Sequence, residues 1–130
     1  MATTLFRGPV LQGKWNRAGV TGYNLEEKTE SYGVQTADLG KSFTSKSGDI
    51  TFTLHTHGAG YTYTFTNTGT DGTNEVKVTA AGAGEMSFAG STGITLTNTK
   101  ATSKVGDYVT LHSIGAVWAL VGIQGTWALS

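Results

Sequence analysis

The chain has 130 residues, no cysteine, 19 glycines, and nine basic and nine acidic residues that leave no net charge. This length suits a single domain, the lack of cysteine excludes disulfides and cysteine-based metal or redox sites, and the balanced charge provides no basic stripe for phosphates. Without a basic stripe, we do not expect nucleic acid as a partner. No apolar run approaches the ~20 residues of a membrane span, so we do not expect a membrane as a partner either.

The first predicted unit is an irregular N-terminal arm or edge segment at residues 1–33, in front of a β-domain at residues 34–130. The start MATTLFRGPV lacks the charged and apolar regions of a secretion signal, which predicts a cytosolic origin. The stretch YNLEEKTESY, residues 23–32, has weak helical spacing. The candidate partner-binding residues of the arm are Leu5, Phe6, Pro9, Val10, Leu11 and Trp15.

This arm is too apolar to remain in water, and its residues follow no regular period. Two interpretations stay open: an extra edge strand over the domain's own core, or an arm that docks on another protein. We expect a partner surface, either another protein or a neighbouring copy of this chain, to cover much of it.

Apolar and polar residues alternate in the stretches DITFTLHTH, GYTYTFTNT, EVKVTAAG, GITLTNT and DYVTLHS. Alternation places one face of a strand on a core and the other in water. The glycines of HGAG and the pair Asp71-Gly72 indicate turns between these strands. We therefore predict an all-β fold, a small antiparallel β-sandwich or barrel of jelly-roll type. The expected inward residues are Ile50, Phe52, Leu54, Tyr61, Tyr63, Phe65, Val76, Val78, Ile94, Leu96, Val109 and Leu111.

The stretch VTLHSIGAVWALVG predicts a strand, a short turn at Gly115 and a second strand. Both faces of residues 116–122 are apolar, which predicts a buried central strand or a face covered by another subunit. We accordingly expect a homo-oligomer, a trimer. A sugar-stacking platform would need polar neighbours, whereas those of Trp118 are aliphatic. The residues assigned to core or oligomer packing are Val117, Trp118, Leu120 and Trp127.

Candidate chemistry is sparse. His55 and His57 lie two apart, which on a strand places both rings on one face, as a metal site requires. No third ligand is adjacent, although His112 could be near in space, and we interpret both residues as exposed rather than metal-binding. The aspartates sit at expected turns, no GxSxG motif occurs, and no cofactor or catalytic activity is expected.

One internal echo is present: TFTNT at residues 64–68 recurs as TLTNT at residues 95–99. It places Asn67 and Asn98 at equivalent strand ends, where asparagine tolerates turn conformations.

The ordered stretches TADLGKSFTSKSGDITFTL, YTYTFTNTG, VKVTAAGAGEMSFAG and VGDYVTLHSIGAVWALVGIQGTW lie within residues 36–127 and form a pattern that covers about residues 34–130. Together they resemble the layout of tailed-phage virion surface β-domains, of the capsid-decoration, head-fibre or tail-fibre type. The chain departs from that layout at the run His55-Thr56-His57, where a proline is common.

The resemblance implies a non-enzymatic virion protein, assembled in the host cytoplasm, with the major capsid protein or another virion protein as its partner. Our first expectation is a capsid decoration protein that stabilises the outer shell. The alternative is a tail-fibre or spike tip that binds host glycans. That alternative would require exposed aromatic residues from the set Trp15, Tyr23, Tyr32, Tyr61, Tyr63 and Trp127.

Overall fold

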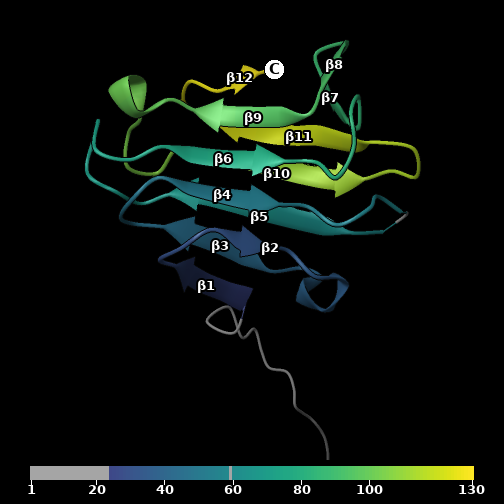
Figure 1. Ribbon diagram of the computed structural model, residues 1–130, viewed down its shortest axis with the longest axis horizontal. Coiled ribbons are helices and arrows are strands. Elements are labelled where there is room, and N and C mark those ends of the chain that lie inside the picture. The colour runs from purple at the N-terminus through teal and green to yellow at the C-terminus, as the bar shows by residue number, and fades with distance from the viewer. Residues whose placement is uncertain (1–23, 59) are drawn as a thin grey trace, which may run out of the picture.

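The computed structural model of the chain describes residues 24–58 and 60–130, which form two β-sheets packed face to face (Figure 1). The predicted all-β sandwich is confirmed. The seven-stranded sheet contains, in spatial order, β1 (Leu25–Lys28), β3 (Ser42–Ser45), β5 (Thr62–Asn67), β10 (Tyr108–Ser113), β11 (Trp118–Gln124), β7 (Met86–Phe88) and β8 (Ser91–Gly93). The five-stranded sheet contains β12 (Ala128–Leu129), β9 (Thr95–Asn98), β6 (Val76–Thr79), β4 (Ile50–Thr53) and β2 (Tyr32–Gly33). Two 3-10 turns lie at Thr36–Asp38 and Lys100–Thr102.

The first six strands alternate between the two sheets, so each connection crosses the sandwich. Strands two apart in the chain therefore become neighbours and run parallel: β1 with β3, β3 with β5, β2 with β4, and β4 with β6. A purely antiparallel arrangement was thus wrong for this half, and both sheets are mixed. The turns at HGAG and Asp71-Gly72 are crossings rather than hairpins. Antiparallel pairing holds for β5–β10–β11 and β6–β9–β12, and the hairpin at Gly115 is confirmed.

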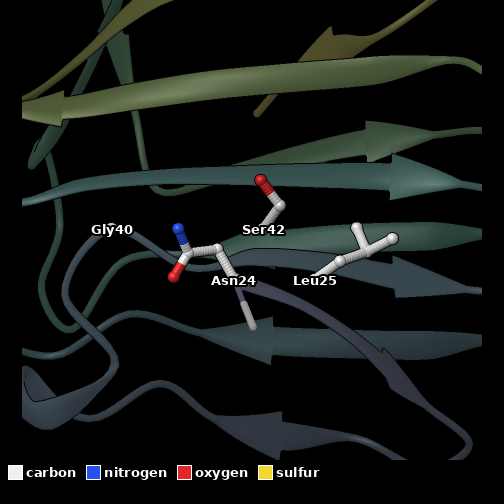
Figure 2. Close-up of a pocket in the computed structure, with 4 residues that line it drawn as sticks. All are labelled: Asn24, Leu25, Gly40 and Ser42. Carbon is white, nitrogen blue, oxygen red and sulfur yellow. The ribbon is translucent and has the colours of Figure 1, made fainter. Parts of the chain in front are cut away.

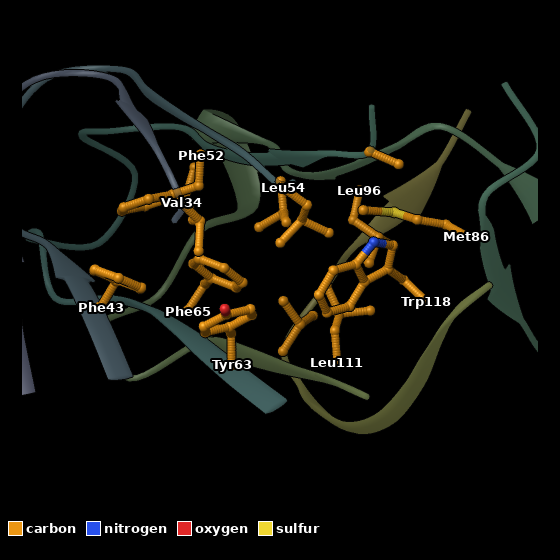
Figure 3. Close-up of a cluster of buried hydrophobic side chains, with 14 of the residues drawn as sticks. Val34, Phe43, Phe52, Leu54, Tyr63, Phe65, Met86, Leu96, Leu111 and Trp118 are labelled. Carbon is orange, nitrogen blue, oxygen red and sulfur yellow. The ribbon is translucent and has the colours of Figure 1, made fainter. Parts of the chain in front are cut away.

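The core lies between the sheets and is built from the alternating residues of β4, β5, β6 and β10 (Figure 3). Phe43 and Phe65 stack with ring centroids 5.7 Å apart, and Phe52 packs on both. Of the expected inward residues, Tyr61 is half-buried and Ile94 is exposed. Ile94 falls where the chain passes from β8 to β9 in the other sheet, so the alternation is interrupted there.

Residues 24–33 belong to the sandwich as edge strands. β1 forms the edge of the seven-stranded sheet and β2 the edge of the five-stranded sheet, so the β-domain begins ahead of residue 34. The helical spacing seen at residues 23–32 was misleading, because the parallel ladder between β1 and β3 fixes Leu25–Lys28 as a strand. The Lys28 ammonium lies 3.7 Å from the centre of the Tyr32 ring. The six arm residues from Leu5 to Trp15 lie outside the described residues.

A β-bulge alters the faces of β11. The register with β10 shifts between Thr110 and Leu111, so that Leu120 faces Leu111 and Gly122 faces Thr110. Leu120 packs against the core, whereas Val121, in the bulge, is 53% exposed. The apolar character of both faces of residues 116–122 therefore reflects one buried face and one exposed bulge.

Candidate functional site

The conspicuous tryptophan of the hairpin lies in the core. Trp118 is 0% exposed and its ring centre lies 5.7 Å from that of Tyr63 and 5.3 Å from that of His55 (Figure 3). Its backbone N–H donates to the Glu85 carbonyl at 2.7 Å, which joins β11 to the start of β7. Trp127 is also buried, and its indole N–H donates to the Gln124 carbonyl. Val117 is half-buried. Neither tryptophan presents a ring to a ligand.

The two histidines considered for a metal site lie beyond the end of β4, in the crossing to β5. His55 is half-buried; its Nδ1 lies 2.8 Å from the Thr56 carbonyl and its Nε2 lies 2.8 Å from the Tyr63 hydroxyl. The His57 Nδ1 contacts the Gly115 carbonyl, which ties this crossing to the β10–β11 turn. Both histidines are half-buried, so the expectation that they are simply exposed was wrong, and His55 packs at the edge of the core. Residues 24–58 and 60–130 contain no group of three or more potential ligand side chains arranged for a metal ion.

A buried polar network joins the two sheets at one end of the sandwich. Asn67 at the end of β5 donates from Nδ2 to Asn98 Oδ1 at 2.8 Å and to the Asn74 carbonyl at 3.1 Å. Its own Oδ1 accepts from the Gly69 N–H at 3.0 Å and from Asn74 Nδ2 at 2.9 Å. The two asparagines of the TFTNT and TLTNT echo therefore lie on opposite sheets and hydrogen-bond directly to each other.

The network continues from Asn98 to the C-terminal strands. Asn98 Nδ2 donates to Asp107 Oδ2 at 2.9 Å and to the Thr126 carbonyl at 3.0 Å. Asp107 Oδ2 also accepts the Lys104 N–H at 2.9 Å. Sequence reasoning had placed Asp107 in a turn and had not singled out Asn74. The sequence pattern places Asn67 and Asn98 at strand ends. Their contacts with Asn74 and Asp107 depend on how the strands pair, which the pattern does not show.

Asp38 ends a 3-10 turn and holds it closed. Its Oδ2 accepts from the Tyr32 hydroxyl at 2.8 Å and from the Gln35 N–H at 2.9 Å, and its Oδ1 lies 3.2 Å from the Lys41 ammonium. Burial alone would raise the pKa of the Asp38 carboxyl, but these three donors together lower it below its usual value. The contacts of the Asp38 carboxylate are with groups of the same domain, so its role is structural.

Most other described carboxylates also have structural partners. Glu26 accepts from Lys41 and Lys28, both at 3.0 Å, and these two hydrogen bonds lower the pKa of its carboxyl. Asp49 accepts the Glu75 N–H at 3.0 Å and pairs with Lys100 at 3.2 Å, and these contacts lower the pKa of its carboxyl. Acid–base catalysis needs carboxylates with separated pKa values facing a substrate, and these groups instead face neighbouring loops.

The outer faces of both sheets carry hydroxyl groups. Thr64 and Thr110 hydrogen-bond across β5 and β10 at 2.9 Å, and Thr79 and Thr95 do the same across β6 and β9. These threonines are the outward residues of the alternating pattern, so the centres of both outer faces are polar.

A shallow hollow of about 350 Å³ lies on the outer side of the seven-stranded sheet, at its β1 edge (Figure 2). Its lining comes from the start of β1 and from the residues leading into β3, namely Asn24, Leu25, Gly40 and Ser42. Leu25 faces Ser42 across the parallel ladder and is 59% exposed. Nothing in the sequence pattern indicated this hollow, because it depends on β1 pairing with β3.

The aromatic residues considered for a glycan site are mostly engaged within the fold. Tyr63 is buried, and burial, followed by the charge of Asp38, raises the pKa of its hydroxyl to about 12. Tyr32 and Tyr61 are half-buried, Tyr32 against Phe43 and Tyr61 against His55. Trp15 and Tyr23 lie outside the described residues.

Comparison of the chain with protein families, with curated proteins and with solved structures gives no match. Among residues 24–58 and 60–130, no helix has the length and apolar character needed to cross a membrane.

Proposed function

We propose that this chain is a non-enzymatic structural protein of a tailed-phage particle, a capsid decoration protein that attaches to the outer shell and stabilises it. The observation behind this proposal is that most polar side chains of the described core make hydrogen bonds and ion pairs within the fold. The carboxylates and histidines of the described core and crossings hold loops and sheets together instead of converging on a cavity. A stiff sandwich with polar outer faces suits a protein that acts by binding a larger surface.

The sequence layout supports the same role, since about residues 34–130 resemble virion β-domains in strand and turn positions. The apolar segment at residues 5–15 then supplies the partner contact, because Phe6, Leu11 and Trp15 would invite aggregation if left in water. The partners in this proposal are the major capsid protein or another virion protein and further copies of the chain, in a homotrimer on the particle.

The test is add-back to particles that lack the protein. Purified chain is mixed with expanded shells, unbound protein is removed by sedimentation, and bound copies are counted against shell subunits. We expect saturable binding at a fixed ratio and a higher temperature of shell rupture. Shells that neither bind the chain nor gain stability would refute the decoration role.

A glycan-binding tail tip is the second candidate. Of the aromatic residues considered for a glycan site, Tyr32 and Tyr61 are half-buried and could still contact a sugar. Labelled chain on a glycan array separates the two functions. Specific sugar binding that is lost on Tyr61→Ala, in a variant that melts like the parent, would favour the tail tip.

A further inference from the structure

Charge is divided unevenly along the chain although it sums to zero. Residues 1–23 contain three of the nine basic residues, Arg7, Lys14 and Arg17, and none of the nine acidic residues. Residues 24–130 therefore carry six basic and nine acidic residues, a net charge of −3. The N-terminal segment and the β-domain have opposite charge, which favours contact between them.

Four acidic residues of the described β-domain have no ion-pair partner within it: Glu27, Glu30, Glu85 and Asp107. Asp107 is buried in the polar network and Glu85 is half-buried before β7, so the two exposed ones are Glu27 and Glu30, near the β1 edge. Five of the six lysines of the domain form ion pairs with its carboxylates, and the sixth, Lys46, follows β3. Glu27 lies on β1 opposite Thr44, and Glu30 lies in the turn that follows β1.

Apolar surface lies at the start of β1, on the same strand as Glu27, while Glu30 follows the other end of that strand. Leu25 precedes Glu27 by two positions on β1, so both side chains are on the outer face of the sheet. Leu25 lines the hollow (Figure 2). Leu39, next in sequence to the lining residue Gly40, is 56% exposed. We call the group formed by Leu25, Glu27, Glu30, Leu39 and the hollow the β1–β3 surface.

We propose that the β1–β3 surface binds residues 1–23 of a neighbouring copy of this chain. The three cations of that segment lie beside Glu27 and Glu30, and one of its large apolar side chains occupies the hollow. This deepens the partner-binding role proposed above for the N-terminal arm by naming its partner as a second copy.

The connection at Asn24 favours a neighbouring copy over the same chain. Asn24 itself lines the hollow, while the cations lie seven, ten and seventeen positions before it. To bring Arg17 back to this surface, the same chain would have to reverse its direction within the seven positions before Asn24. The segment of another copy can approach the hollow without that reversal.

Sedimentation velocity of the full chain at micromolar concentrations tests the proposal without any shell. We expect concentration-dependent association that weakens between 50 and 500 mM salt, about the range over which surface charges become screened. Leu25→Asp should raise the dissociation constant about tenfold or more, the equivalent of about 1.4 kcal/mol. Val105→Asp is the matched control, because Val105 is 58% exposed and lies between the second 3-10 turn and β10. It should leave association unchanged.

Charge reversal provides the sharper test. One variant carries Arg7→Glu, Lys14→Glu and Arg17→Glu, and the other carries Glu27→Lys and Glu30→Lys. Each alone should remain monomeric, while an equimolar mixture should associate, because the reversed segment of one chain then meets the reversed surface of the other. Circular dichroism checks that both variants fold.

Three results would overturn the proposal. They are a parent chain that is monomeric under all these conditions, a mixture of the folded variants that stays monomeric, and an association that disappears on nuclease treatment. Failure here leaves shell binding untouched, because add-back to shells is measured separately.

Discussion

Replacing Asn98 with aspartate tests whether the asparagine network holds the two sheets together. Asn98 is fully buried and its Nδ2 donates to the Asp107 carboxylate and to the Thr126 carbonyl. The substitution Asn98→Asp keeps the shape of the side chain and turns that double donor into an acceptor. A second carboxylate then faces Asp107, which is itself buried.

The size of the effect follows from these contacts. Two hydrogen bonds are lost, each worth about 1 kcal/mol, and the Asp107 carboxylate that loses one of its donors is buried, which raises the cost. An uncompensated buried charge costs about 3–5 kcal/mol. Because these contributions overlap, we expect Asn98→Asp to lower the free energy of unfolding by about 4–5 kcal/mol at pH 7, a large share of the ~5–15 kcal/mol of a typical domain.

Urea denaturation followed by tryptophan fluorescence measures this loss. Asn24→Asp, the same chemical change at an exposed position, is the control and should alter stability by less than about 0.5 kcal/mol. A loss below about 1 kcal/mol for Asn98→Asp at pH 7 would refute the role assigned to the network.

Three further predictions concern the core and the crossings. Trp118→Ala should cost about 3–5 kcal/mol in thermal or chemical unfolding, since it empties a fully buried site, and a variant that melts like the parent would contradict this. Gly125→Ala should cost about 2–4 kcal/mol, because Gly125 has φ +92° and a Cβ there would overlap the Asp107 carboxylate; an unchanged denaturation midpoint would count against it. The Tyr63 hydroxyl has its pKa raised to about 12 in the folded chain, against 10 as the ordinary value, so its contribution is intact below pH 10 and is lost as pH rises to 12. This loss should amount to about 2–3 kcal/mol in denaturation measured across that window, and Tyr63→Phe should reduce it.

The alternating pattern was sufficient to predict which residues face the core. The inward residues of β4, β5, β6 and β10 are buried, since a period of two follows from the geometry of an extended chain and needs no knowledge of neighbours. The exceptions were Tyr61, which is half-buried, and Ile94, which is exposed where the chain passes from β8 to β9 in the other sheet.

The alternating pattern does not predict which strands pair with each other. A glycine-rich turn such as HGAG can close a hairpin or carry the chain across a sandwich, and the flanking alternation is the same in both cases. In the structure, Phe52 on β4 packs against Phe43 and Phe65 on β3 and β5 of the opposite sheet, which identifies the turn as a crossing. The parallel pairs of the first half follow from that choice.

The polar contacts were predictable only as single residues. The TFTNT and TLTNT echo identified Asn67 and Asn98, but their contact depends on β5 and β9 lying in opposite sheets. The β1–β3 surface was missed for a related reason. The charge of the whole chain sums to zero, and its uneven distribution gains meaning only when β1 is placed at an edge.

The strand crossings have a consequence for the speed of folding. Sheet neighbours in the first half are far apart in the chain: Leu25 pairs with Ser42, Phe43 with Phe65, and Ile50 with Val76, separations of 17, 22 and 26 positions. In the β10–β11 hairpin, Leu111 pairs with Leu120 only nine positions away. Closing long loops costs entropy before any contact forms, so the hairpin is the natural place for structure to begin. The parallel strands then assemble late, and the chain should fold in milliseconds to seconds rather than in microseconds.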